Sequence, residues 1–268
     1  GAFWIGAVVG RDTLVSVGAD GWQLTREMFP DEAPFGKIIK RSILDPESDE
    51  YEGAISEEDY IAVYTDTLTE GIIDNYDATP HSPLNIQVTQ SSFAWSYSYA
   101  EDFVLFDYKI RNIGMRSLED VYMGIYIDAD VKYENSEEGF DDDICGFLSS
   151  AVDSCSKCEY TDSTVFTAWI ADNDGDFDRE YGQSGMQRHP APAVTATRIV
   201  RTPQDSLDVS FNWWIGNGNP ALDFGPRERP FTGKWKEPFR EFGTGGTGTP
   251  EGDANKYYTL RNREFDYD

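Results

Sequence analysis

The sequence predicts an all-β fold: an antiparallel β-sandwich, jelly-roll or Ig-like, with long Gly/Pro-rich loops and at most one or two short helices. Three observations lead to this prediction. Several apolar runs alternate with polar residues at a period of two. Aromatic residues, which pack well on pleated sheets, make up 14% of the chain. Turn signals recur between the runs without a linker or an internal repeat, so residues 1–268 are expected to form a single domain.

The first half of the chain is expected to begin with a hairpin. Ala2–Val9 is apolar and aromatic, and Thr13–Val17 follows it after a short turn. Lys37–Ile43 is a weaker strand candidate. Ser56-Glu57-Glu58-Asp59 matches a capping box and predicts a short helix over Tyr60–Tyr64.

The clearest period-two patterns lie between Ile86 and Asp130. After Ile86–Gln90, the run FAWSYSY places Phe93, Trp95, Tyr97 and Tyr99 on one face. The runs FVLFDYKI and VYMGIYID alternate in the same way and are separated by an Asn-Ile-Gly turn. Successive segments of this kind are typical of half-buried antiparallel strands.

The second half contains fewer strand signals. Thr164–Ala171 predicts a strand, and Thr195–Arg201 with Leu207–Trp214 predicts another hairpin. Gly216–Pro250 is rich in Gly and Pro and is expected to be mostly loop. Tyr257–Leu260 is a candidate closing strand.

The charge of the chain excludes several classes of function. Its net charge is −27 and its pI is about 4.2, so it would repel nucleic acid and anionic membrane surfaces. No apolar stretch reaches the roughly 18–20 residues of a membrane span. Self-repulsion of this size destabilises a compact state unless it is neutralised. Bound divalent cations would neutralise it; the alternative is surface acidity for solubility or salt adaptation.

Three acidic clusters are candidate calcium ligands. Two of them follow predicted strands, so their carboxylates could converge at one edge of the sandwich, and the third precedes Cys145. Calcium takes six to eight oxygen ligands, which alternating Asp residues in a tight loop can supply. The predicted metal ligands are Asp128, Asp130, Asp142, Asp143, Asp172, Asp174, Asp176 and Asp178.

The loop Asp172–Asp178 is not an EF-hand. Counted from Asp172, its glycine is at position four rather than six, and position twelve is Gln183 rather than Glu. The alternative is a solvated loop in which Asp favours turns through local hydrogen bonds. Magnesium is less favoured than calcium because it demands tighter octahedral geometry.

The three cysteines leave their pairing open. Cys145 could form a disulfide with Cys155 or Cys158 in an oxidising compartment. Free thiols are the second interpretation. A zinc or redox role for Cys155-Ser-Lys-Cys158 is the third, although no nearby residues complete a set of four ligands.

No catalytic motif stands out, and we expect the chain not to be an enzyme. The two histidines, His81 and His189, lie in Pro-containing loops, and neither a GxSxG elbow nor an HExxH helix is present. A pair of carboxylates for glycoside hydrolysis is possible, but nothing marks out one pair. Trp95, Trp213 and Trp214 could form a sugar-stacking platform, although core packing is the commoner role for Trp in strands.

The segment EDFVLFDYKIRNIGMRSLEDVYMGIYIDADV resembles an uncharacterised family of secreted β-sandwich proteins from Bacteroidota-like bacteria. The parts DDICGF, AWIADNDGD, FNWWIGN, DFGPR and GTPEGDANKYY are similar to other pieces of that family. Its proteins often carry a type IX secretion sorting domain, which is not recognisable in this sequence. The resemblance implies secretion, a β-sandwich and metal-bearing Asp loops, without implying a catalytic residue.

These observations predict a non-catalytic, secreted or cell-surface module that binds Ca²⁺ and has a structural or adhesive role. One alternative is a self-assembling subunit of an extracellular filament or surface layer, with an exposed strand Phe3–Val9 adding to a neighbour's sheet edge. The other alternative is a carbohydrate-binding or glycoside-hydrolase-associated module. The expected partners are accordingly a second copy through edge strands or a surface glycan.

Overall fold

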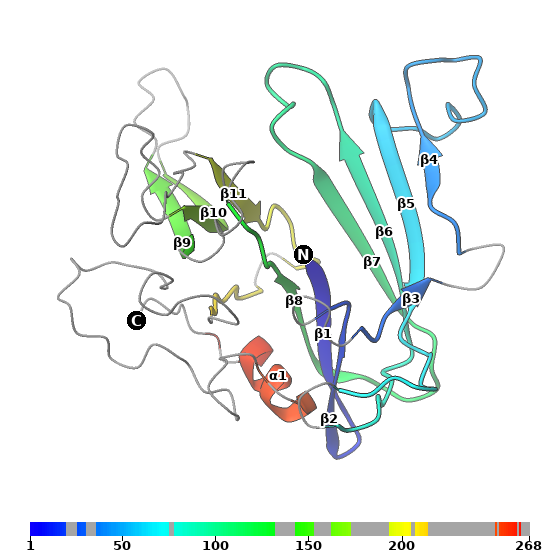
Figure 1. Cartoon of the computed structure of the whole chain (residues 1–268), viewed down its shortest axis with the longest axis vertical. Helices are drawn as coiled ribbons and strands as arrows, with labels where there is room; N and C mark the ends of the chain where they lie inside the picture. Colours follow the sequence, from blue (N-terminus) through cyan, green and yellow to red (C-terminus); the bar gives the residue numbers. More distant parts are fainter. Residues whose placement is uncertain are drawn as a thin grey trace, which may run out of the picture. The chain divides into compact units, whose positions relative to one another are not determined.

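The computed structural model describes residues 1–19, 26–30, 36–74, 78–131, 143–152, 162–172, 193–204, 207–213, 250, 252–261 and 263. In these ranges the chain forms antiparallel sheets and one short helix, so the prediction of an all-β fold is confirmed (Figure 1). No helix within them is long and apolar enough to cross a membrane.

The chain divides into two compact units. The N-terminal unit consists of Ala2–Tyr126 and Gly252–Tyr257. The C-terminal unit consists of Gly1, Ile127–Glu251 and Tyr258–Asp268.

The first sheet of the N-terminal unit has the order β2-β1-β8. Its strands are β1 (Ala2–Val9), β2 (Asp12–Val17) and β8 (Glu119–Tyr126). The predicted N-terminal hairpin is confirmed, with Val9 opposite Asp12 and Gly10 at a φ of 72° in the turn between them. Glycine suits this position because a positive φ costs it nothing.

The expectation that Phe3–Val9 is an exposed strand is wrong. β1 is the central strand of its sheet and pairs with β2 on one side and β8 on the other. Most of its residues are buried. Both of its backbone edges are therefore used, and it cannot add to a neighbouring molecule's sheet in this fold.

The second sheet of the N-terminal unit has the order β3-β5-β6-β7, and β4 also pairs with β5. Its strands are β3 (Phe29–Pro30), β4 (Ile39–Arg41), β5 (Glu58–Thr65), β6 (Ile86–Ala94) and β7 (Leu105–Asn112). The strands predicted at Ile86–Gln90 and in FVLFDYKI are confirmed as β6 and β7.

A single apolar core joins these two sheets. It contains Phe3, Ile5, Ala7 and Val9 from β1, and Leu84, Ile86 and Val88 in or just before β6. These are alternate residues of their strands, which is why the period of two appears in the sequence. Fully burying each large apolar side chain stabilises the fold by about 1.5–3 kcal/mol.

The helix predicted over Tyr60–Tyr64 is wrong, because this segment belongs to β5. The Asp59 carboxylate accepts hydrogen bonds from the backbone N–H groups of Ile55 at 2.7 Å and Ser56 at 2.8 Å, and from the Ser56 hydroxyl. These bonds close a turn that leads into a strand. Pairing with β4 and β6 on both sides outweighs the local helix signal.

The strand predicted in FAWSYSY ends earlier than its pattern suggests. β6 stops at Ala94, because the β6–β7 ladder ends near Phe93 opposite Leu105. Tyr97 then begins a turn, and its carbonyl accepts the Ala100 N–H at 2.7 Å. The aromatic residues after Ala94 therefore belong to the tip of the β6–β7 hairpin.

The sheet of the C-terminal unit has the order β11-β10-β9. Its strands are β9 (Asp143–Val152), β10 (Asp162–Asp172) and β11 (Val194–Arg198), of which β9 was not predicted. Gly146 stands opposite Trp169, and the indole ring lies where a Cβ atom at residue 146 would be. This close approach explains a glycine inside a strand.

The hairpin predicted from Thr195–Arg201 and Leu207–Trp214 is only half correct. The first segment forms β11, but residues 207–213 form no strand, and Trp214 lies outside the described residues. Phe211 instead stacks on Phe147 of β9, with ring centroids 5.2 Å apart. Packing on a sheet face thus accounts for the apolar pattern here.

The closing strand predicted at Tyr257–Leu260 is also wrong, because these residues lie in α1 (Gly252–Arg261). Asp253 and Arg261 occupy the first and last turns, where their charges suit the helix dipole. Asp253, Lys256 and Tyr257 have the i, i+3, i+4 spacing of one helix face. Tertiary contacts on that face favour the helix over a strand.

Candidate functional sites

The structure brings together residues of two of the three acidic clusters of the C-terminal unit. Asp143, the first residue of β9, is directly opposite Asp172, the last residue of β10. The Val131 N–H, which follows Asp128 and Asp130 in the chain, donates a hydrogen bond to Asp143 Oδ2 at 3.0 Å. Residues predicted from separate segments therefore meet at one end of the β9–β10 pair.

The remaining predicted ligands are either exposed or lie outside the described residues. Asp128 and Asp130 are exposed after β8, whereas Asp143 is only 8% exposed. The described residues contain no group of three or more His, Cys, Asp or Glu that could hold a metal ion. Four predicted ligands lie outside the described residues: Asp142, Asp174, Asp176 and Asp178.

Opposed carboxylates favour a cation on electrostatic grounds. Like charges directly opposite each other in an antiparallel pair destabilise it. The oxygen atoms of Asp143 and Asp172 are hard donors of the kind that Ca²⁺ prefers. Two carboxylates are fewer than the six to eight oxygen ligands that Ca²⁺ takes, so a calcium site at this pair would need ligands from other residues.

Of the three cysteines, only Cys145 is described. It lies in β9 opposite Ile170 of β10. Cys155 and Cys158 lie outside the described residues, so the disulfide stays a prediction.

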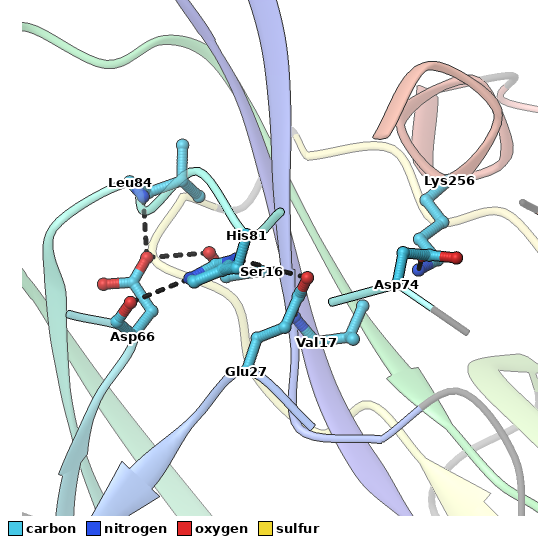
Figure 2. A network of polar contacts seen from close by, with 8 residues as sticks. All are labelled: Ser16, Val17, Glu27, Asp66, Asp74, His81, Leu84 and Lys256. Atoms are coloured by element: carbon cyan, nitrogen blue, oxygen red, sulfur yellow. Dashed lines mark hydrogen bonds and ion pairs between the residues drawn. The ribbon is translucent and has the colours of Figure 1, made fainter. Parts of the chain in front are cut away.

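A buried polar network, which sequence reasoning missed, lies in the N-terminal unit (Figure 2). Its first part is an ion pair between Glu27 and His81, whose side chains are 5% and 1% exposed. Glu27 Oε1 is 3.2 Å from His81 Nδ1, and Glu27 Oε2 accepts the Val17 N–H at 2.9 Å. His81 Nε2 is 2.8 Å from the carbonyl oxygen of Asp66.

These contacts favour the doubly protonated, positively charged form of His81. A carbonyl oxygen can only accept, so Nε2 carries a proton, and the carboxylate at Nδ1 favours a second one. Burial opposes the charged ring, but the hydrogen bond and negative charge of Glu27, together with Asp66, raise the pKa of His81 above its usual value.

The Asp66 side chain forms the second part of the network. This carboxylate is fully buried and joins β2 to the start of β6. Its three donors are the Ser16 hydroxyl at 2.7 Å, the Leu84 N–H at 2.7 Å and the Ile86 N–H at 2.8 Å. Ser16 therefore bonds to Asp66 and not to His81, which differs from the order of a Ser–His–Asp triad.

The third part connects Gly252–Tyr257, the portion of α1 that belongs to the N-terminal unit, to the rest of that unit. Lys256 Nζ lies 2.6 Å from Asp74 Oδ2, and the two side chains are 1% and 6% exposed. The next residue, Tyr257, donates its hydroxyl to the Asp120 carbonyl at 2.9 Å and packs edge-on against Tyr122. The four buried residues Glu27, Asp66, Asp74 and His81 are called the polar seat below.

Asp253 of α1 is another titratable group whose charge is influenced by Glu27, Lys256 and His81. Burial and then the negative charge of Glu27 raise its pKa to about 7, against smaller opposing effects of Lys256, a hydrogen bond with the Val15 backbone and His81. A protonated Asp253 is thus compatible with its acidic surroundings near neutral pH.

An exposed group of aromatic side chains lies at the tip of the β6–β7 hairpin. Tyr97 and Tyr99 are 43% and 81% exposed, and their rings stack at 5.5 Å. Trp95 packs against Phe103 with centroids 6.5 Å apart, and Phe103 is 45% exposed. We call Trp95, Tyr97, Tyr99 and Phe103 the aromatic tip.

The sequence predicted only part of the aromatic tip and none of the polar seat. It singled out Trp95 as a sugar-stacking residue together with Trp213, which is half-buried, and Trp214, which is not described. Nothing in the pattern distinguishes Glu27, Asp66 or Asp74 from the other acidic residues. No family model, no curated protein and no solved structure matches this chain.

Proposed function

We propose that the chain is a non-catalytic, secreted or cell-surface module that binds Ca²⁺ and has a structural or adhesive role. The main support is the position of Asp143 opposite Asp172 at the end of the β9–β10 pair. A cation bound there would relieve the repulsion between the two carboxylates and tie together two strand ends. Composition and the resemblance to secreted bacterial proteins support an extracellular location.

The geometry of the polar seat supports a non-catalytic role. His81 is almost completely buried, and both of its ring nitrogens face acceptors within the protein. A general base must reach a proton on the substrate. His81 instead contributes to folding in this proposal.

Calcium is expected to stabilise the C-terminal unit. At a concentration of 100 times Kd, a ligand that binds only the folded state adds about 2.7 kcal/mol. Each kcal/mol of added stability raises the Tm of a protein of this size by about 2–4 °C, so calcium should raise the Tm by roughly 5–10 °C. Differential scanning calorimetry with millimolar calcium and with excess chelator measures this shift.

Asp172→Asn tests the location of this site, with calcium affinity measured by isothermal titration calorimetry. The variant should lose about tenfold or more in affinity, because it removes one charged ligand. Asp102→Asn, on the exposed β6–β7 turn, is the matched control and should bind as the wild type does. Equal calcium binding by all three proteins would refute the site, and no binding by the wild type would refute calcium altogether.

A carbohydrate-binding module is the second candidate function, and the aromatic tip favours it. Exposed rings such as Tyr99 can stack on the apolar faces of sugar rings, while the adjacent Glu101 and Asp102 can accept hydrogen bonds from hydroxyl groups. Contiguous exposed apolar surface often marks an interaction site.

Tyr99→Ala is expected to weaken binding of an oligosaccharide by about 2–10-fold, the equivalent of an aromatic contact of about 0.5–1.5 kcal/mol. Saturation-transfer NMR with cellohexaose, xylohexaose and chitohexaose identifies a bound sugar, and titration gives its affinity. Tyr51→Ala, at another exposed tyrosine, is the control. A wild type that binds none of these sugars, or a Tyr99→Ala variant with unchanged affinity, would count against this function.

A further inference from the structure

The strand β7 has one backbone edge that no other described strand covers. It is the last strand in the order β3-β5-β6-β7, and among the described strands it pairs only with β6 (Figure 1). Alternate residues of such an edge direct their N–H and C=O groups away from the sheet, where another strand can pair with them. β7 is eight residues long and contains no proline, so its whole edge can form a ladder.

Apolar side chains are also exposed along this strand. Phe106 is 54% exposed, Leu105 is 39% exposed, and Val104, just before the strand, is 49% exposed. Tyr108 and Ile110 pack against the core, and Phe106 continues their row through a stack with Tyr108 at 6.3 Å. A strand added to this edge would extend the sheet and cover part of the row.

The charged side chains of β7 do not protect this edge from a second copy of the chain. Proteins often protect edge strands with charged side chains, lysine above all. On β7, however, Asp107 and Lys109 are of opposite sign, are 55% and 76% exposed, and lie 3.7 Å apart. Because the two charges differ in sign, a second β7 can place an opposite charge against each of them.

The middle of β7 is complementary to itself in the antiparallel direction. With Tyr108 opposite its equivalent in the second copy, Asp107 is opposite Lys109, and this pair occurs twice by symmetry. In the same register, Phe106 is opposite Ile110. A register centred on Asp107 or on Lys109 instead places two like charges opposite each other, which is unfavourable. The charges therefore select the register centred on Tyr108.

We propose that two copies of the chain associate through β7, which pairs antiparallel with β7 of the second copy around a two-fold axis at Tyr108. The two five-stranded sheets then form one continuous sheet. A single pair of strands is a small contact, typical of weak association, so the Kd is expected to be on the order of 10–100 μM. Pairing through β7 needs neither calcium nor a sugar, so it is independent of the proposed function.

The net charge of −27 opposes association of two copies at long range. At about 0.15 M salt the Debye length is about 8 Å, so most of this repulsion is screened. Side chains that are directly opposite in a strand pair lie within about 5.5 Å of each other, where screening is weaker. The opposed charges on the two β7 strands therefore act where the distant charges do not.

Sedimentation velocity at this salt concentration measures the association. Between about 1 and 500 μM, on both sides of the expected Kd, the wild type should change from monomer to dimer. Amide exchange of β7 peptides should slow over the same range, whereas that of β1 peptides should not change. A monomer at every concentration would overturn the proposal without any variant. Near 1 μM the monomer prevails, so variants of Asp107 and Lys109 report there on the stability of the monomer.

Asp107→Lys places two lysines opposite each other twice and should weaken dimer formation by about tenfold or more. It also changes the net charge from −27 to −25 (−27 + 2), which favours association at long range, so a loss would be due to the local pairing. Asp49→Lys, on an exposed loop, makes the same change in net charge and is the matched control, which should not weaken the dimer.

The charge-swapped variant Asp107→Lys/Lys109→Asp restores an opposite charge at each position and should recover the dimer. Lys109→Asp alone should remain monomeric, as Asp107→Lys does, but an equal mixture of these two single variants should form a mixed dimer. An Asp107→Lys dimer of wild-type affinity would contradict pairing in this register. So would single variants whose mixture stays monomeric while the wild type dimerises.

Discussion

Lys256→Met is expected to destabilise the N-terminal unit by about 3–5 kcal/mol. The Lys256 side chain is 1% exposed, and its ammonium group lies 2.6 Å from Asp74. Methionine has a similar length but no charge, so the variant leaves the Asp74 carboxylate buried beside an apolar group. The cost of a buried charge without its counter-ion dominates, since the loss of packing is small.

The double variant Asp74→Leu/Lys256→Met separates this cause from a loss of packing. Replacing both members of a buried ion pair by apolar groups is often close to neutral, so the double variant should recover most of the stability. Lys109→Met is the control, because that ammonium group is 76% exposed and lies 3.7 Å from Asp107, a surface pair worth about 0–1 kcal/mol.

Urea unfolding of these variants should be followed by hydrogen exchange of peptides from β1 and β6, which report on the N-terminal unit alone. Equal stability of Lys256→Met and the wild type would show that the ion pair contributes nothing. A double variant less stable than Lys256→Met would show that charge burial is not the cause.

Asp66→Asn should produce the next largest loss, about 2–4 kcal/mol. Asp66 Oδ1 accepts the Ile86 N–H, and Oδ2 accepts the Leu84 N–H and the Ser16 hydroxyl. An Asn amide has one acceptor oxygen, so its NH₂ group must face at least one of the two backbone N–H groups. Either orientation leaves a buried donor without an acceptor.

Urea unfolding measured on the same β1 and β6 peptides tests this prediction. Asp107→Asn, at a 55% exposed carboxylate on β7, is the control and should change stability by less than about 0.5 kcal/mol. Comparable losses of stability in Asp66→Asn and Asp107→Asn would mean that the hydrogen bonds of Asp66 do not stabilise the fold more than a surface carboxylate does.

The sequence by itself determined that the chain is all-β and where most strands lie. Alternation in Ala2–Val9 and in FVLFDYKI marks one apolar face of each strand, and this local property survives in the core formed by β1 and β6. The sequence also placed Asp172 at the end of a predicted strand, whereas the position of Asp143 at the start of β9 came from the structure. A single domain over residues 1–268, calcium binding and secretion stay predictions.

Only the tertiary structure decided which local signals would prevail. Ser56–Asp59 resembles a helix start, and Tyr257–Leu260 resembles a strand, yet the first leads into β5 and the second lies in α1. Neighbouring strands supply the backbone partners of β5, and Asp74, Asp120 and Tyr122 supply partners of α1. Such partners outweigh intrinsic propensities of a few tenths of a kcal/mol per residue.

The polar seat could not be read from the sequence for a related reason. The chain has 49 acidic residues, and no local pattern distinguishes Glu27, Asp66 and Asp74 from those in solvent. Lys256 and Asp74 are 182 residues apart. Whether a charge is buried, and which charge opposes it, depends on how sheets and helix pack, because burial and pairing are properties of the folded chain and not of its local segments.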